Sequence, residues 1–273
     1  DNLTVNGTSQ VVSGLNPDVT YYYRVRAFST NSTSANSNVI SAQTLCEAYV
    51  TASAGANGTI TPTGVTTFNC ADDAEYTITA NTCYTIQDVV VDGISVGPVS
   101  SYTFNNISAG NHTISATFTL NTFNITASAG AGGSISPDGI SVVNCGGDIT
   151  YDITPTACNS IADVLVDGVS VGAVSTYTFN NVNDIHTISA SFAVIPYTIT
   201  VNQGANGNIS PGTGTVDCGG SQLYTITADP CYTIADVLVD GVSVGAVSSY
   251  EFTNVQAPHT ITASFTAINY TIV

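Results

Sequence analysis

The chain has almost no basic residues. It contains 2 Lys plus Arg against 19 Asp plus Glu in 273 residues, which gives a formal net charge of −17. Both bases, Arg24 and Arg26, lie near the start, and no Lys or Arg follows Cys46. Nucleic-acid phosphates and anionic lipid headgroups are bound mainly through Lys and Arg. The composition therefore argues against nucleic-acid and membrane-surface partners, and it leaves few trypsin-type cleavage sites, as suits a protein exposed outside a cell.

Long apolar segments are missing as well. No run of 18 apolar residues occurs, so the sequence predicts no membrane-spanning helix, and no basic segment followed by an apolar core marks a signal peptide. Met is absent even at position 1. We expect an interior segment of a longer protein, with any export signal or anchor lying elsewhere.

One long motif occurs three times. The stretch "IADVLVDGVSVGAVSTY" (Ile161–Tyr177) returns almost unchanged at Ile234–Tyr250, and more loosely it stands earlier at Ile86–Tyr102. Self-similarity at a fixed period indicates a repeat protein. The predicted division is a partial domain at 1–45, β-repeats at 46–122, 123–196 and 197–269, and the first strand of a further repeat at 270–273.

The periodicity within each repeat is that of β-strands. In "HTISATF" (His112–Phe118) and "HTITASF" (His259–Phe265), apolar residues alternate with Thr or Ser, which is typical of a strand with one buried face. No segment has helical periodicity. We predict an all-β fold of tandem small β-sandwich-like modules in a rod, each of seven or eight short strands. Links of three or four residues should fix the orientation of neighbouring repeats.

An Asp-Gly pair recurs in the middle of the long motif. Asp and Gly tolerate the positive φ angles of a tight two-residue hairpin. The sequence therefore predicts hairpin turns at Asp92 with Gly93, Asp167 with Gly168, and Asp240 with Gly241.

The chain has seven cysteines, and six of them recur with the period of the repeats. Three pairs have the same short spacing: Cys70 with Cys83, Cys145 with Cys158, and Cys218 with Cys231. We predict a disulfide within each repeat, which leaves Cys46 unpaired or bonded to a residue elsewhere. By the loop-closure relation each bridge would contribute about 3 kcal/mol. Buried free thiols, a metal site and pairing between repeats remain as alternatives. Disulfides also imply an oxidising location outside the cytosol.

The start of the chain resembles the last strands of a fibronectin type III domain. The segment "GLNPDVTYYYRVRAFSTNSTSANSNVISAQT" (Gly14–Thr44) has the Leu-x-Pro step, the corner tyrosine and the Arg-Val-x-Ala strand of such domains. The matching residues are Leu15, Pro17, Tyr21, Arg24, Val25 and Ala27. Thirteen preceding residues are too few for the other strands of such a domain.

The repeats themselves resemble the divergent internalin-type B-repeat of bacterial surface and secreted proteins. The ordered set "ISP", "CGG", "YTITADPCY", "ADVLVDG", "YTFNNV" and "HTISASF" carries this resemblance over Tyr49–Asn269. Two positions depart from the family pattern. Val89, Val164 and Val237 replace an aromatic residue, and Cys83, Cys158 and Cys231 replace a Gly. The resemblance implies a surface-stalk or adhesin role, and the departures imply a smaller core compensated by a covalent bridge.

Several polar side chains are candidates for binding or catalysis. His112, His186 and His259 begin strands, one in each repeat, and a structural role is favoured over metal binding or pH sensing. The pairs Asp88 with Asp92, Asp163 with Asp167, and Asp236 with Asp240 would lie about 13 Å apart on an extended strand, too far to share an ion unless the turn folds one residue back, so a turn role is favoured over calcium binding. No arrangement of Ser, His and acid points to catalysis, and we expect no enzyme.

Calcium and glycans are the candidate additions. The acid cluster Asp72, Asp73 and Glu75 is the best calcium candidate, although it lacks a regular calcium-loop pattern, and we expect no other cofactor. Asn-x-Ser/Thr triplets offer glycosylation acceptors. The principal ones are Asn57, Asn106, Asn111, Asn124 and Asn208.

The sequence favours a non-enzymatic stalk or filament segment of an extracellular cell-surface adhesin of bacteria or archaea. Its expected partners are neighbouring repeats of the same longer chain and an unidentified surface glycan or protein. A carbohydrate-binding accessory region of a secreted polysaccharide-degrading enzyme is one alternative, although Trp, a common sugar-stacking residue, is absent. Self-assembly with other copies into a fibre, by strand addition, is the other.

Overall fold

The structure is a computed structural model that describes residues 3–5, 7 and 9–269. Every regular element in this part of the chain is a β-strand, so the all-β prediction is confirmed. None of the described residues forms a helix long and apolar enough to cross a membrane. Residues 270–273, predicted to begin a further repeat, lie outside the described residues.

The N-terminal segment forms a small two-stranded sheet. Strand β1 (Thr20–Tyr23) pairs antiparallel with β2 (Ile40–Gln43). The Tyr21 hydroxyl accepts a hydrogen bond from the Asn16 backbone N–H at 2.8 Å, the kind of bond made by a corner tyrosine in β-sandwiches. No described residue up to Leu45 is buried. The fibronectin-like assignment of residues 1–45 stays a prediction.

Each of the following three repeats contains eight strands in the same order. The first repeat has β3 (Glu47–Ala54), β4 (Gly58–Thr61), β5 (Gly64–Asn69), β6 (Ala74–Ala80), β7 (Tyr84–Val91), β8 (Ile94–Gly97), β9 (Ser101–Phe104) and β10 (Gly110–Leu120). The second has β11 (Thr122–Ala129), β12 (Gly133–Ser136), β13 (Gly139–Asn144), β14 (Ile149–Pro155), β15 (Asn159–Val166), β16 (Val169–Gly172), β17 (Thr176–Phe179) and β18 (His186–Val194). The third has β19 (Pro196–Gln203), β20 (Gly207–Ser210), β21 (Gly214–Asp217), β22 (Gln222–Ala228), β23 (Tyr232–Val239), β24 (Val242–Gly245), β25 (Ser249–Phe252) and β26 (His259–Ala267).

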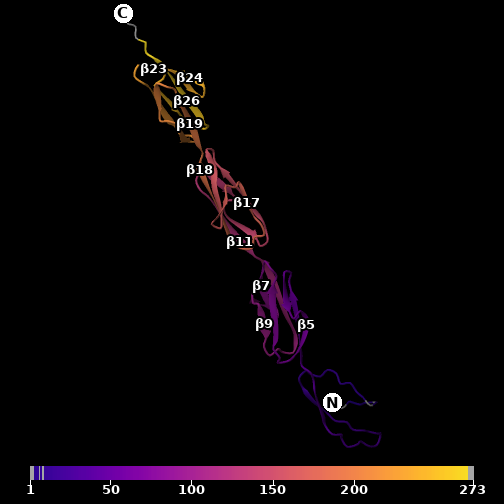
Figure 1. Cartoon of the computed structure of the whole chain (residues 1–273). Coiled ribbons are helices and arrows are strands. Elements are labelled where there is room, and N and C mark those ends of the chain that lie inside the picture. Colours follow the sequence, from indigo (N-terminus) through magenta and orange to yellow (C-terminus); the bar gives the residue numbers. More distant parts are fainter. Residues whose placement is uncertain (1–2, 6, 8, 270–273) are drawn as a thin grey trace. The chain divides into compact units, whose positions relative to one another are not determined.

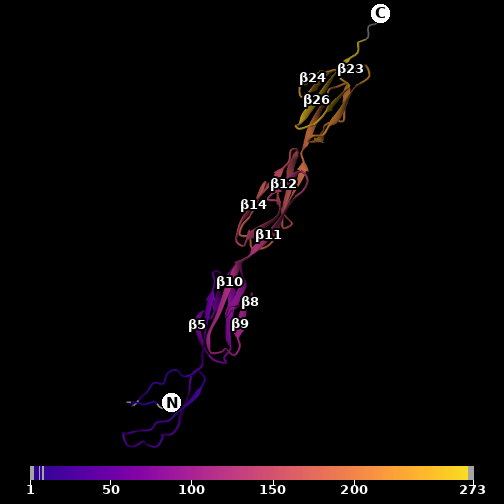
Figure 2. The ribbon, with the colours of Figure 1, turned by 180° about the vertical axis from the view of Figure 1, so that it is seen from behind.

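Two sheets make up each repeat. In the first repeat the larger sheet has the order β5-β3-β10-β7-β8 and the smaller one β4-β6-β9. The first and last strands of the repeat, β3 and β10, pair in parallel in the larger sheet, and the other neighbours are antiparallel. The same order recurs in the second and third repeats. Figure 1 labels β19, β26, β23 and β24 of the third repeat, and Figure 2 labels β5, β10, β8 and β9 of the first.

A separate hydrophobic core fills each repeat. Alternate strand residues point inward, and each core is centred on a fully buried tyrosine: Tyr76, Tyr151 or Tyr224. Each of these rings meets a phenylalanine edge-on, with ring centroids 5.9 to 6.0 Å apart. By compactness the chain divides into Asp1–Asn121 and Thr122–Val273, and the second unit contains two of the cores.

The links between repeats are shorter than predicted. Strand β10 ends at Leu120 and β11 begins at Thr122, while β18 ends at Val194 and β19 begins at Pro196. One residue separates the strands in each case. Around the second link the ladders continue to both ends, because Asn159 pairs with Val194 in the second repeat and Pro196 pairs with Asp217 in the third. Because strand pairing continues up to the link on both sides, the link has little conformational freedom.

Candidate functional site

The cysteines pair differently from the sequence prediction. The structure joins Cys46 to Cys70 and Cys158 to Cys218, with Cα atoms 5.4 and 5.3 Å apart. Cys83 and Cys145 are also disulfide-bonded, whereas Cys231 is free and exposed. The predicted pairs Cys70–Cys83, Cys145–Cys158 and Cys218–Cys231 are therefore wrong, and so is the prediction of Cys46 as the residue left over.

The reason lies in the strand between the predicted partners. Cys70 directly follows β5 and Cys83 directly precedes β7, with the seven-residue strand β6 between them. An extended strand of this length spans about 23 Å. The two cysteines consequently lie toward opposite ends of β6, and the flanking loops do not bring them back together. The same order of strands recurs in the other two repeats.

A single link residue connects Cys158 with Cys218 through the backbone. The Ile195 N–H donates to the Cys158 carbonyl at 2.9 Å, and the Ile195 carbonyl accepts from the Cys218 N–H at 2.9 Å. The disulfide joins the same two residues, Cys158 and Cys218, covalently. Cys46 takes the place of the link residue at the start of the first repeat, because its carbonyl accepts from the Cys70 N–H at 3.2 Å. Each described disulfide thus secures the entry of the chain into a repeat.

The cysteines that precede β7, β15 and β23 share an unusual backbone conformation. Cys83, Cys158 and Cys231 have φ angles of 70°, 67° and 69°, in the left-handed region that favours glycine. The glycine that the B-repeat resemblance leads us to expect at this position would adopt this conformation without strain. A cysteine there is strained, and at Cys158 the disulfide offsets that strain.

The Asp-Gly pairs form the predicted hairpin turns. Asp92 and Gly93 have φ angles of 48° and 81°, and the flanking residues Val91 and Ile94 pair directly, as a two-residue turn requires. The other pairs repeat this geometry: Asp167 and Gly168 have φ angles of 50° and 78°, and Asp240 and Gly241 of 49° and 80°. The hairpin prediction is confirmed at all three turns.

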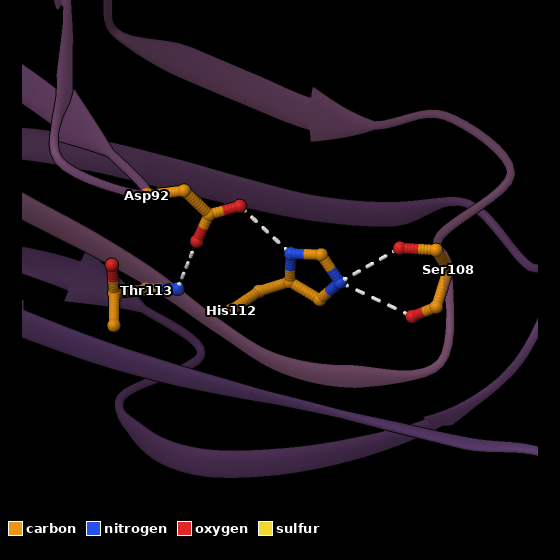
Figure 3. Close-up of polar contacts among 4 residues, drawn as sticks. All are labelled: Asp92, Ser108, His112 and Thr113. Carbon is orange, nitrogen blue, oxygen red and sulfur yellow. Dashed lines mark hydrogen bonds and ion pairs between the residues drawn. The ribbon is translucent and has the colours of Figure 1, made fainter.

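Each turn aspartate also binds a histidine, a pairing that the sequence analysis missed. Nδ1 of His112 lies 2.7 Å from the Asp92 carboxylate, whose other oxygen accepts the Thr113 backbone N–H at 2.7 Å. Figure 3 shows the imidazole between Asp92 and Ser108. Nε2 lies 3.1 Å from the Ser108 carbonyl and 3.3 Å from its hydroxyl. Ser108 can therefore accept a hydrogen bond from the charged ring or donate one to the neutral ring.

The pair recurs in the other repeats. His186 lies 2.8 Å from Asp167, and His259 lies 2.7 Å from Asp240. The sequence signal was the nearly constant spacing between the turn aspartate and a strand-initial histidine. Antiparallel pairing of β7 with β10, and of its equivalents, brings these two positions side by side.

Hydrogen bonding shifts the protonation of these groups. The bond to Asp92 raises the pKa of His112, although partial burial acts in the opposite direction. Partial burial tends to raise the pKa of Asp92, but the bonds from His112 and the Thr113 N–H outweigh it and lower that pKa. The pKa values of Asp167 and Asp240 are lowered in the same way. The His112–Asp92 pair is therefore a structural contact whose strength depends on pH.

The histidine rings also connect the two sheets of a repeat. His112 belongs to β10 in the larger sheet, and its ring packs on Phe104 of β9 in the smaller sheet, with centroids 5.6 Å apart. The equivalent rings in the other repeats lie 5.0 Å apart. Among the described residues, no three His, Cys, Asp or Glu side chains form a group that could hold a metal ion.

The other acidic candidates have separate partners. Asp73 accepts the Asn106 N–H at 2.8 Å, Asp72 accepts the Asn69 amide at 3.2 Å, and Glu75 lies on strand β6. The structure does not bring these three carboxylates into one site. Asp88 accepts the Ser95 hydroxyl at 2.6 Å, and Asp163 and Asp236 make the equivalent bond to serine. The two aspartates of each motif are thus used separately.

All five principal glycosylation candidates are exposed. They are Asn57, Asn106, Asn111, Asn124 and Asn208. Their use as acceptors stays a prediction.

Comparison with known proteins agrees with the repeat assignment. Residues 197–269 match the family described as the divergent InlB B-repeat domain, which confirms the predicted resemblance for the third repeat. None of the curated proteins matches the chain.

Among solved structures, the chain is similar to the Bacillus anthracis TIE protein at 8% identity and a TM-score of 0.42, covering 89% of this chain and 57% of that one. It is also similar to an I9–I11 tandem from titin (9% identity, TM-score 0.14, covering 80% of this chain and 95% of that one). A third is the central fibronectin-III array of RIM-binding protein (11% identity, TM-score 0.14, 78% and 96%). The chain thus spans a little over half the length of the TIE chain.

Proposed function

We propose that this tandem β-repeat chain, whose third repeat is a divergent B-repeat, is a non-enzymatic stalk segment of an extracellular cell-surface adhesin. The observation that carries the proposal is the link at Ile195. One residue, hydrogen-bonded to the repeats on both sides, connects the second repeat to the third, and a disulfide closes over it. Such a link suits a part that holds other domains at a distance.

The disulfide changes how the chain would carry tension. A pull on the two ends passes from Cys158 to Cys218 through the sulfur atoms and bypasses the residues between them. The bypassed segment contains β15 to β18 of the second repeat and β19 to β21 of the third. These strands stay unloaded while the bond is intact, so stretching an oxidised chain extends it less than stretching a reduced one.

Two further properties support the extracellular setting. Stable disulfides form in oxidising compartments, and six of the seven cysteines are bonded. The near absence of Lys and Arg leaves little for trypsin-type proteases outside the cell. Its expected partners are neighbouring repeats and a surface glycan or protein.

Two experiments test this proposal. Antibodies against the chain should label intact cells of the source organism, and labelling that requires permeabilisation would contradict the surface location.

In single-molecule stretching, the Cys158→Ser/Cys218→Ser double variant should release about 200 Å more length on unfolding than the oxidised wild type, from 60 residues at about 3.5 Å each. Equal lengths would contradict the bypass.

Self-assembly is a second candidate, favoured by the N-terminal segment. The β1–β2 sheet has no buried residue, and Tyr22 and Ile40 are 73% and 68% exposed. Strand addition from another copy would extend this two-stranded sheet at its edge. Polymers detected by sedimentation should disappear when residues 1–45 are deleted, and polymers that survive this deletion would exclude this sheet as the contact.

A further inference from the structure

The free thiol of Cys231 lies where the other repeats carry a bonded cysteine. Cys231 precedes β23 as Cys158 precedes β15, with φ angles of 69° and 67°. Cys158 is bonded to Cys218 of the next repeat, and Cys83, at the same place in the first repeat, is also disulfide-bonded. Cys231 is exposed and has no partner among the described residues.

The backbone around Cys231 already makes the first of the two hydrogen bonds of the bonded joint. The Ile268 N–H donates to the Cys231 carbonyl at 2.8 Å, as the Ile195 N–H donates to Cys158 at 2.9 Å. At the bonded joint the Ile195 carbonyl then accepts the Cys218 N–H, which brings the two cysteine Cα atoms within 5.3 Å. Ile268 is thus placed as Ile195 is, beside a thiol in the same conformation.

The strain at this position supports the same reading. A cysteine in the left-handed region is less stable than glycine, so the residue is unfavourable unless its sulfur forms a disulfide. Cys158 forms such a disulfide. Cys231 has the same strained conformation but no disulfide.

We propose that Cys231 is a docking and cross-linking site for a further β-repeat that presents a cysteine at the place of Cys218. The N–H of that cysteine would bind the Ile268 carbonyl, and its Sγ would bond to Sγ of Cys231. The two thiols lose two protons and two electrons, and a low-molecular-weight disulfide accepts them and is cleaved to two thiols. This inference concerns the joint alone and does not depend on the cellular location proposed above.

The test extends the full chain by one repeat. Tyr270–Val273 match Tyr197–Thr200 at three of four positions in sequence, so residues 201–269 are added after Val273, with the copy of Cys231 replaced by glycine so that the added repeat carries one cysteine. The copied cysteine then follows Cys231 by the same 60 residues that separate Cys158 from Cys218. A second version adds residues 127–196 instead, with the copy of Cys158 replaced by glycine, so that the result does not rest on the folding of one copy.

The readout is the pairing of Cys231 after oxidation with glutathione disulfide at micromolar protein. Chymotrypsin separates the cysteines of each repeat onto different peptides, because Tyr224 lies between Cys218 and Cys231 and Tyr76 between Cys70 and Cys83. We expect at least 90% of Cys231 bonded to the copied cysteine in both versions. A Cys231 that stays open to alkylation, carries glutathione or forms symmetric dimers in both versions would overturn the proposal.

Two controls separate docking from mere proximity. Replacement of the copied cysteine by serine should restore one free thiol at Cys231. Moving that cysteine two residues earlier in the added repeat, to the place of Val216 in β21, displaces it by about 7 Å. The displaced cysteine should link at least tenfold more slowly. Equal rates would show that any nearby thiol reacts and that the joint is not preformed.

Discussion

Cys158 is bonded to Cys218 across the link at Ile195, whereas Cys231, which follows Cys218 within the same repeat, stays free. The cysteines therefore form bonds between elements that are distant in sequence and adjacent at a joint. This relationship gives the first prediction.

Non-reducing chymotryptic peptide mapping of the native chain should recover the Cys158 peptide linked to the Cys218 peptide, and the Cys46 peptide linked to the Cys70 peptide. Alkylation without reduction should label Cys231 alone. The physical reason is the length of β6 and its equivalents, which keeps the cysteines of one repeat apart. Recovery of a Cys218–Cys231 peptide pair would refute the arrangement.

The Cys231→Gly variant should stabilise the third repeat by about 1 kcal/mol, because glycine removes the cost of a side chain at φ 69° and no bond is lost. Amide hydrogen exchange in β22 and β23 measures this locally. Cys231→Ala is the matched control and should change little, since the strain remains. The Cys158→Gly variant should instead lower the free energy of unfolding, because it also removes a disulfide worth about 4 kcal/mol by the loop-closure relation for 60 residues.

The first repeat should lose stability as pH rises from 6 to 8. The folded-state pKa of His112 is raised, so its contribution is complete below the unfolded value of about 6.5 and is lost as pH passes through the folded value. The lowered pKa of Asp92 removes its contribution only as pH falls below about 3.8. The pair is therefore strongest between about pH 4 and 6.5. The loss should be under about 1 kcal/mol, because the Asp92 side chain is 42% exposed.

The matched variant for this pH dependence is His112→Asn, which keeps a donor for Asp92 but does not titrate. Hydrogen exchange in β10 at pH 5.5 and pH 8 should differ in the wild type and much less in the variant. An unchanged pH dependence in His112→Asn would assign the effect to other groups.

Tyr151→Phe should leave the stability of the second repeat unchanged or raise it by up to about 1 kcal/mol. The hydroxyl of this fully buried residue has no hydrogen-bond partner among the described residues, so its removal relieves a desolvation cost and leaves the ring packing intact. Thermal unfolding followed by exchange in β14 checks this. The Tyr151→Ala variant is the contrasting change and should cost about 3 to 5 kcal/mol through the cavity it leaves. A similar loss in Tyr151→Phe would indicate a hydrogen bond to the hydroxyl.

Much of the fold follows from local sequence signals. Alternating apolar residues predicted the strands, and the Asp-Gly pairs predicted the hairpins, because both depend on neighbours in the chain. Eight strands in each repeat agree with the expected seven or eight.

The disulfide pairing could not be read in the same way. Equal spacing made Cys70 and Cys83 look like partners, but bonding depends on distance in space, and β6 holds them apart. The odd cysteine count contained a usable signal, since a pairing that includes Cys46 must leave another cysteine free, and that cysteine is Cys231. The His112–Asp92 pair was missed because the two residues meet only through the pairing of β7 with β10.

The bond between Cys158 of one repeat and Cys218 of the next has a consequence for how such a protein can grow. A tandem duplication of one whole repeat adds one cysteine before the middle strand of the smaller sheet and one after it, in that order. With the joint proposed for Cys231, the first cysteine of the new copy bonds to the free cysteine of the preceding repeat. The second cysteine of the new copy is then free in its turn. Copy number can rise or fall without any compensating mutation, so the length of the array is free to vary while its covalent continuity is inherited.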